Sequence, residues 1–332
     1  MGAFINKIAY YLPDKIITNQ DLVYEFPGWN ASKIEEKVGI KQRHIAEINQ
    51  TALDLAYEAS LEILKDFDKD SIDFILLCTQ SPDYFLPTSA CVLQDRLGLK
   101  TTCGALDFNL GCSGYIYGLA LAKGLINSRV ASNVLLVTSE TYSKHINKKD
   151  IGNRTIFGDG AAATIVSLSD KEHIFEFELG TDGKGMDKLI VPNGALKSRF
   201  NPDEKDYIDE SGNIRNNNNL YMNGPDIFNF TISSVPTLIS NVLKKNHISF
   251  EEVDYYIFHQ ANKYMLDYLR KKIKIPEEKF YQDMTTTGNT VSATIPIALK
   301  DSLDKGLANT NSKIVLAGFG VGFSWGACLI II

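Results

Sequence analysis

The 332-residue sequence predicts an α/β fold built from two similar halves. Short runs of β-branched and apolar residues alternate with longer segments of helical periodicity, which is the pattern of an α/β protein. The same order of strand, small-residue turn and helix recurs about 180 positions further along the chain. A ligand site is expected between two such halves, because pockets favour interfaces of this kind.

The first half is assigned to residues 1–172. The sequence predicts its strands at 71–80, 132–140 and 161–168, and its helices at 52–67 and 114–126. The apolar run ALDFNL leads through a glycine-flanked cysteine into the second of these helices. The turn between them is therefore the first candidate for a functional site.

The second half is assigned to residues 173–332. The sequence predicts strands at 253–260 and 312–320, helices at 263–273 and 291–303, and a final strand. The segment 193–219 departs from this pattern, because it carries a proline, five acidic residues and four consecutive asparagines. We expect it to be a polar excursion on the surface.

Composition excludes several classes of protein. The net charge of -6 is the opposite of the basic excess typical of nucleic-acid binding, so no nucleic-acid partner is expected. No apolar stretch approaches the roughly 20 residues that span a bilayer, and the first residues show no secretion signal. We expect a cytoplasmic protein without a membrane partner. Five cysteines without a C-x-x-C pair predict free thiols and neither a disulfide framework nor a zinc site.

Cys112 lies between two glycines where the apolar run gives way to a helix. At a helix N-terminus, the dipole and the unpaired N–H groups stabilise a thiolate and lower the pKa of the thiol. Glycines on either side let a substrate or another segment of backbone approach closely. Taken alone, the cysteine fits a small buried hydrophobe better than a nucleophile.

Two further candidates lie in the second half. His259 ends a predicted strand, and side chains at the carboxyl ends of strands often border the site of an α/β protein. Asn289 lies in the turn that corresponds to the turn of Cys112, although it can equally be a helix-capping residue. Together, a thiol, an imidazole and a carboxamide are the groups needed to hold an acyl group and polarise a thioester carbonyl.

These three residues and the motifs around them resemble those of a known family. The motifs GCSG, HQAN, GNTVSATIP and FGVGFSWG, in this order and spacing, look like those of β-ketoacyl-acyl carrier protein synthase III, in the thiolase-like superfamily. The resemblance extends to VGIKQRHIA, IFGDGAAA and the final strand, and so covers nearly the whole chain. It implies a five-layered αβαβα fold with two pseudo-symmetric halves, usually in a homodimer.

The resemblance also implies a mechanism. Cys112 attacks a primer thioester and keeps its acyl group, while His259 and Asn289 donate hydrogen bonds to the carbonyl of a malonyl-carrier thioester as carbon dioxide leaves. The backbone N–H groups of Cys112 and Val321 form the oxyanion hole of the second step. No metal or redox cofactor is expected. The substrates are thioesters of coenzyme A or of acyl carrier protein.

The residues that hold coenzyme A in this family are altered here. Lys37 stands in place of an arginine, and Trp29 is displaced from the usual position of a tryptophan. Ile151 stands where the family usually has an arginine, although Arg154 is near. Pro225 replaces an asparagine. Lys37 and Arg154 are therefore the candidate coenzyme A contacts.

Two more sets of residues follow from the resemblance. Basic residues on the helix at 263–273 and just after it hold the acidic carrier protein in the family, and the chain offers Lys263, Arg270, Lys271 and Lys274 there. An ordinary solvated helix face is the alternative interpretation.

Leu86 falls where the family presents a residue to the acyl pocket of the partner subunit, or Phe85 takes that place after a shift of one position.

The expected reaction is the condensation of an acyl primer with malonyl-acyl carrier protein that initiates fatty acid synthesis. A relative that serves a surface polysaccharide or secondary metabolism with an unusual primer is the alternative, and a non-catalytic partner subunit is a third hypothesis. The substitution pattern at the coenzyme A contacts and Leu86 favour a medium-chain or otherwise unusual primer, delivered on coenzyme A or on a carrier protein.

Overall fold

The computed structural model describes residues 2–210 and 212–332, and it contains two five-stranded sheets with the same strand order. The first sheet has the order β1-β7-β6-β4-β5 and the second the order β8-β16-β15-β13-β14. Their strands are β1 (Gly2–Tyr11), β7 (Gly160–Ser169), β6 (Asn133–Glu140), β4 (Phe74–Cys78) and β5 (Gly104–Phe108), then β8 (Ile174–Thr181), β16 (Ser324–Ile331), β15 (Lys313–Gly320), β13 (Tyr255–Phe258) and β14 (Phe280–Tyr281).

The sequence repeat corresponds to matching register in the two sheets. In the first sheet, Phe74 of β4 lies opposite Val134 of the parallel strand β6. In the second sheet, Tyr255 of β13 lies opposite Ile314 of the parallel strand β15. Tyr255 follows Phe74 by 181 positions and Ile314 follows Val134 by 180, which is the spacing of the sequence repeat, so the prediction of two pseudo-symmetric halves is confirmed.

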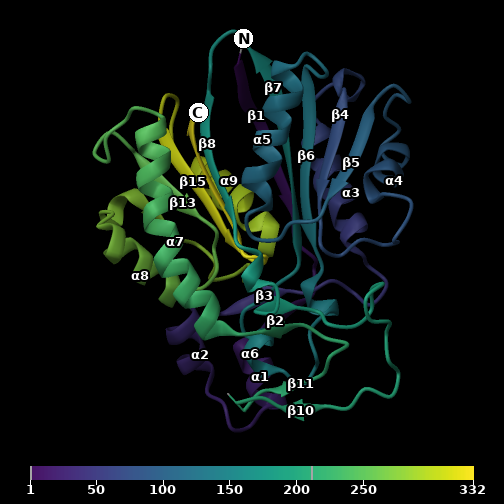
Figure 1. Cartoon of the computed structure of the whole chain (residues 1–332). Helices are drawn as coiled ribbons and strands as arrows, with labels where there is room; N and C mark the ends of the chain where they lie inside the picture. Colours follow the sequence, from purple (N-terminus) through teal and green to yellow (C-terminus); the bar gives the residue numbers. More distant parts are fainter. Residues whose placement is uncertain (1, 211) are drawn as a thin grey trace.

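Helices complete a five-layered arrangement (Figure 1). Helices α5 and α9 lie between the sheets, because α5 contacts strands of both sheets and α9 contacts β7 and β15 among others. Helices α3 and α4 cover the outer face of the first sheet, and α7 and α8 cover that of the second. The bounds are α3 (Ala52–Leu64), α4 (Ser89–Arg96), α5 (Gly114–Asn127), α7 (Gly224–Lys245), α8 (Lys263–Ile273) and α9 (Thr294–Asp304). The expected αβαβα order is therefore confirmed.

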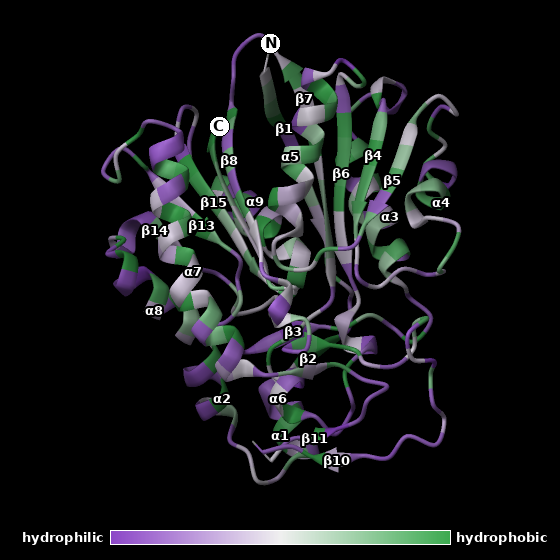
Figure 2. Ribbon diagram, viewed as in Figure 1, coloured by the Kyte–Doolittle hydropathy of each residue, from purple (hydrophilic) through white to green (hydrophobic). Residues whose placement is uncertain are grey.

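Local sequence accounts for where several of these helices begin. Thr51 and Asp54 form a reciprocal capping box before α3, and Asn223 caps α7 with Pro225 in its first turn. The central helix α5 packs so closely on the sheet that a Cβ atom on Gly118 would lie 2.5 Å from Leu136. The apolar strands between the helical layers form the hydrophobic part of the molecule in Figure 2.

Shorter elements gather at one end of the sheets, which is the lower end in Figure 1. Strands β2 and β3 form one ribbon there, β9 and β12 a second, and β10 and β11 a third. The bounds are β2 (Ile16–Thr18), α1 (Asn19–Glu25), α2 (Ala31–Val38), β3 (Gln42–His44), α6 (Ile151–Arg154), β9 (Leu189–Ile190), β10 (Tyr207–Ile208), β11 (Ile214–Arg215) and β12 (Tyr221–Met222).

The segment 193–219 contains the β10–β11 hairpin. Most of its side chains before β11 are exposed, as the sequence predicts for a polar excursion. Arg215 of β11, however, is buried and forms ion pairs with Asp150 and with Asp209. The hairpin is therefore attached to the start of α6. In the part of the chain that the structure describes, no helix has the length and apolarity needed to cross a membrane.

Candidate active site

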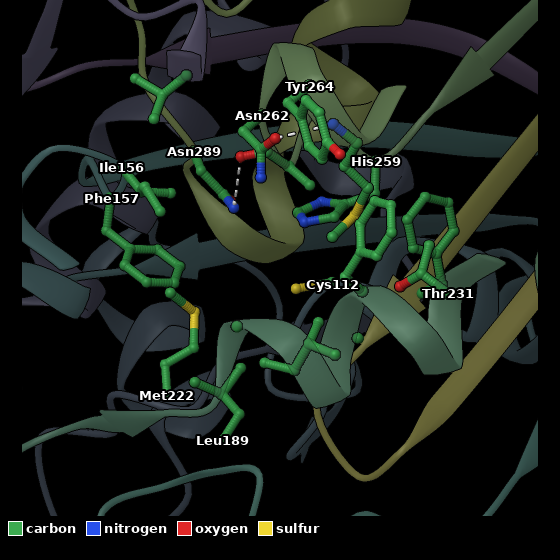
Figure 3. Close-up of a pocket in the computed structure, with 18 of the residues that line it drawn as sticks. Cys112, Ile156, Phe157, Leu189, Met222, Thr231, His259, Asn262, Tyr264 and Asn289 are labelled. Carbon is green, nitrogen blue, oxygen red and sulfur yellow. Dashed lines mark hydrogen bonds between the residues drawn. The ribbon is translucent and has the colours of Figure 1, made fainter. Parts of the chain in front are cut away.

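Cys112, His259 and Asn289 line one cavity of about 530 Å³ at the lower ends of the two sheets (Figure 3). The cysteine comes from the first half of the chain and the other two residues from the second half. Apolar side chains form much of the remaining wall, among them Ile156, Phe157, Leu189, Met222, Ile227 and Phe228. The structure thus brings together the three residues that the sequence singles out.

Cys112 lies in the short connection between β5 and α5, two positions before Gly114, which begins the helix. Two glycines of β15 pack directly against it. A Cβ atom on Gly320 would lie 2.8 Å from the Cys112 sulfur, and one on Gly318 would lie 2.6 Å from the Cys112 carbonyl oxygen. These glycines are required because strand β15 and the nucleophile loop approach more closely than a side chain allows.

The backbone N–H groups of Val321 and of Cys112 itself lie beside the cysteine sulfur, and both act to lower its pKa. Burial outweighs them, because only 6% of Cys112 is exposed, and it raises the pKa of the thiol to about 12. Our expectation that the helix terminus lowers this pKa is therefore wrong for the free protein. Desolvation of the charged form is larger than the effect of the N–H groups.

His259 follows β13 and is buried beside the cavity. Its Nδ1 lies 2.7 Å from the hydroxyl oxygen of Thr294, the first residue of α9. The ring also contacts Phe319 edge-on, with centroids 5.9 Å apart. Burial lowers the pKa of His259 to about 3, so the imidazole is neutral at physiological pH, and Nε2 is the nitrogen left for the cavity.

Asn289 lies in the turn before α9, and its side-chain orientation is fixed by two hydrogen bonds. Its Oδ1 accepts a hydrogen bond from the Val291 N–H at 2.9 Å, and its Nδ2 donates to the Ala261 carbonyl at 3.3 Å. The second N–H of the amide is left for the cavity. The backbone of Asn289 is paired with Ile156 and Gly158 in the first half of the chain. Asn289 therefore stabilises its own turn and presents an N–H donor to the cavity.

Two buried residues at the site were not found from the sequence. Thr294 belongs to the GNTVSATIP motif, but the sequence does not show that its hydroxyl contacts His259. Glu140, at the end of β6, is fully buried, and burial raises its pKa to about 8. An acidic residue that ends a strand with the apolar run VLLV was the available signal for Glu140.

The two candidate contacts for coenzyme A lie in different places. Lys37 lines the catalytic cavity and an adjoining cavity of about 1120 Å³, which the β10–β11 hairpin and Trp29 also line. Arg154 lines neither of them. It forms a bidentate ion pair with Glu25, at 2.6 Å and 3.0 Å. Arg154 lines a separate cavity beside Glu25, so its assignment as a coenzyme A contact stays a prediction that this structure does not support directly.

The four candidate contacts for the carrier protein differ in their exposure and in their ion pairs. Lys263 and Lys271 are exposed and line a groove of about 250 Å³ beside Lys37. Arg270 is half-buried and forms an ion pair with Glu277 at 3.1 Å. Lys274 is exposed at the end of α8. Lys263 forms an ion pair with Asp267 of the same helix, so Lys271 is the basic residue best placed at the mouth of the site.

Leu86 and Phe85 do not line the catalytic cavity of their own chain. Both are exposed, Leu86 by 82% and Phe85 by 73%. They precede α4, and Thr88 in the same segment accepts a hydrogen bond from Asp107 of the edge strand β5. The two side chains therefore form an unusually apolar patch beside a free sheet edge.

Comparison with known proteins gives a consistent result. A family model for the 3-oxoacyl-[acyl-carrier-protein (ACP)] synthase III C terminal matches residues 243–332, and a model for 3-oxoacyl-[acyl-carrier-protein (ACP)] synthase III matches residues 106–183. The chain is 38% identical over 323 residues to a beta-ketoacyl-[acyl-carrier-protein] synthase III of Clostridium perfringens, with 96% of each protein covered.

Solved structures agree with this result. A crystal structure of a 3-oxoacyl-(acyl-carrier-protein) synthase III has a TM-score of 0.98 and 46% identity, with all of both chains covered. The synthase III of Aquifex aeolicus has a TM-score of 0.85 and 30% identity, also with complete coverage of both chains. The fold, the site and these similarities show that this chain belongs to the 3-oxoacyl-[acyl-carrier-protein] synthase III family of condensing enzymes.

Proposed function

We propose that the chain condenses an acyl primer thioester with malonyl-acyl carrier protein to give 3-oxoacyl-acyl carrier protein and carbon dioxide, the step that initiates fatty acid synthesis. The observation that carries this proposal is the single cavity in which Cys112 faces His259 and Asn289. A buried thiol beside two neutral hydrogen-bond donors suits acyl transfer followed by decarboxylation.

In the first half-reaction, the sulfur of Cys112 forms a bond to the primer carbonyl carbon, and the bond to the carrier sulfur breaks. The proton of the Cys112 thiol ends on the departing carrier thiol. The backbone N–H groups of Cys112 and Val321, which contact the sulfur in the free protein, lie where they can stabilise the oxyanion. Formation of a neutral thioester also removes the cost of holding a buried thiolate.

In the second half-reaction, the malonyl group loses carbon dioxide and its carbonyl oxygen takes up negative charge. We assign the free N–H of Asn289 and the Nε2–H of His259 as donors to this oxygen. In that tautomer, Nδ1 of His259 is an acceptor for the Thr294 hydroxyl 2.7 Å away, and this hydroxyl turns to it from the Val291 carbonyl oxygen, which lies 3.0 Å from the hydroxyl. Loss of carbon dioxide supplies the electron pair, so the step needs neither a strong base nor a redox cofactor.

The resulting enolate attacks the acyl-Cys112 carbonyl, a carbon–carbon bond forms, and Cys112 leaves as a thiolate that takes one proton from solvent. The test is a panel of acyl primers offered on both coenzyme A and carrier protein, with malonyl-carrier as the extender. We expect 3-oxoacyl-carrier product by mass spectrometry with at least one primer. Primer loading without any condensed product would contradict the proposal.

We further infer a homodimer in the cytoplasm. Strand β5 is an edge strand whose Leu106 is exposed, and it lies beside the apolar patch formed by Phe85 and Leu86 and beside the exposed Tyr84. A second copy that pairs along β5 buries this patch and satisfies the free edge. A reducing compartment keeps free thiols such as Cys112 available.

We expect the carrier protein to bind beside α8. Lys271→Glu places a negative charge in the groove at the site mouth and repels an acidic carrier. The Michaelis constant for malonyl-carrier should rise about fivefold, equivalent to roughly 1 kcal/mol, the upper range for an exposed ion pair. The salt dependence of binding should weaken at the same time. Lys272→Glu is the matched control, because Lys272 is exposed on the same helix but does not line the groove.

Equal Michaelis constants for the Lys271 and Lys272 variants would place the docking surface elsewhere.

We expect Leu86 to set the primer length from the partner subunit. Leucine leaves space for a chain longer than acetyl, and each added buried methylene contributes about 0.8 kcal/mol, close to fourfold in kcat/KM. Leu86→Phe should lower kcat/KM for six- to eight-carbon primers and leave acetyl unchanged. Phe85→Leu is the control for a shift of one residue.

A wild-type rate that peaks at acetyl and falls with every added carbon would overturn this assignment.

A further inference from the structure

Glu140 is a buried acidic residue that takes no part in the steps above. It ends β6 in the first half of the chain, and its side chain lies between the two halves of the site. From the first half, its carboxyl accepts hydrogen bonds from the Gln80 N–H at 3.1 Å and the Ser81 hydroxyl at 3.3 Å. From the second half, it accepts one from the Ser292 hydroxyl at 3.0 Å. None of these three donors is a cation.

Ser292 belongs to the turn that carries Asn289. The two residues are three positions apart, and between them the N–H of Val291 donates to the Asn289 side chain. This turn continues directly into α9. A hydrogen bond at Ser292 therefore acts on the same rigid piece of backbone that orients the Asn289 amide.

The opposite end of the network reaches the nucleophile loop. Gln80, which donates to Glu140, also approaches Gly111, where a Cβ atom would lie 2.6 Å from its side-chain oxygen. Gly111 directly precedes Cys112. The carboxyl of Glu140 thus connects the segment that packs on the nucleophile loop with the turn that carries Asn289.

We propose that Glu140 is a positioning residue that fixes the Asn289 turn relative to the Cys112 loop across the two halves of the site. The inference rests on the proposed function, because it concerns the distance between the acyl carrier and the malonyl-binding donor. A carboxyl suits this role because its two oxygens can accept hydrogen bonds from both halves at once. Misplacement of a reacting group by about 1 Å can cost about 100-fold in rate.

The inference predicts that the two half-reactions respond differently. Loading of Cys112 does not use Asn289, so it should be little affected when the link to Ser292 is lost. Condensation needs the Asn289 N–H at the malonyl carbonyl, so it should fall. A residue that only fills the core would instead lower both reactions together through loss of folded protein.

The experiment compares Ser292→Ala with Ser81→Ala. Each removes one hydroxyl that donates to Glu140, but Ser292 links to the Asn289 turn and Ser81 remains within the first half. We expect Ser292→Ala to lower kcat for condensation about 10- to 100-fold while acyl loading, followed by protein mass, stays within about twofold. Ser81→Ala should leave both rates within about threefold. Equal losses in the two variants would overturn the proposal.

Variants of Glu140 itself provide the second comparison. Glu140→Ala should lose condensation as Ser292→Ala does, and the double variant should be no worse than Glu140→Ala, because both remove one connection. Glu140→Gln keeps the shape and an acceptor oxygen, so it should retain most of the condensation rate. Additive losses in the double variant, or a Gln variant as poor as the Ala variant, would contradict a positioning role through Ser292.

The pH profile of cysteine alkylation separates the effect of position from the effect of charge. The negative charge of Glu140 contributes to the raised pKa of Cys112, so Glu140→Gln should move the alkylation profile of the cysteine to lower pH, and Ser292→Ala should not. This shift of the alkylation profile should appear only above about pH 8, where Glu140 is ionised. The other titratable groups near the carboxyl are Cys78, Tyr142, His145 and Asp159.

A wild-type protein that neither loads nor condenses would contradict the proposed function itself. Failure of the proposed function is therefore distinguishable from failure of the positioning role of Glu140.

Discussion

Cys112→Ala should abolish loading of the enzyme with an acyl group. The sulfur is the only group of the site that we assign as a nucleophile, so loading should fall by at least about 1000-fold. Cys112→Ser should be equally inactive, because a hydroxyl in the same buried position is a much weaker nucleophile without an adjacent base. Incubation with an isotopically labelled acyl thioester and measurement of intact protein mass checks both variants.

The matched control is Cys91→Ala, which removes a free cysteine that is exposed on α4. This variant should gain the mass of one acyl group, as the wild type does. Peptide mapping should then place that group on Cys112. Retention of the acyl group by Cys112→Ala would transfer the role to another residue and overturn the assignment of the site.

His259→Ala and Asn289→Ala should impair the decarboxylation and condensation of the malonyl group while acyl loading continues. Each removes one proposed donor to the malonyl carbonyl, and loss of a single donor of this kind costs about 100- to 1000-fold in rate. Acyl loading should remain, because Cys112 and the backbone N–H groups are unchanged. Release of carbon dioxide from labelled malonyl-carrier measures the loss, and the mass of the acyl-enzyme measures the loading that remains.

His173→Ala is the control for the histidine variant, because His173 lies away from the cavity and contacts Phe4. It should keep both half-reactions. Decarboxylation at the wild-type rate by the His259 variant would show that the imidazole is not a donor in this step. The neutral state of His259, with its pKa lowered to about 3, predicts no loss of condensation from its titration between pH 6 and pH 8.

Much of the architecture follows from the periodicity of the chain. The predicted strands at 71–80, 132–140 and 312–320 contain β4, β6 and β15, and the predicted helices at 114–126 and 263–273 correspond closely to α5 and α8. These elements are visible in the sequence because burial on one or both faces imposes a regular pattern of apolar residues. The repeat between the halves was visible for the same reason, since equivalent positions in two sheets require similar side chains.

The site was predictable in part, because its residue types are chemically distinctive. The strand end at His259 and the two small-residue turns at Cys112 and Asn289 could be located without a structure. The direction of the Cys112 pKa shift could not be found this way. A helix terminus is a local feature of sequence, whereas the desolvation that raises this pKa depends on packing by strand β15 from the other half.

The order of amino acids was enough to predict the alternation of strands and helices, the pseudo-symmetry of the halves and the identity of the three central side chains. Packing in three dimensions was needed to show that Glu140 meets Ser292, that Arg154 turns toward Glu25, and that Lys271 rather than Arg270 is available at the site mouth. The two residues of a contact are far apart in the chain, or one of them has several charged residues nearby with which it could pair. Hydrogen bonds and ion pairs between them leave no periodic trace in the sequence, because a single polar residue can be satisfied by many different neighbours.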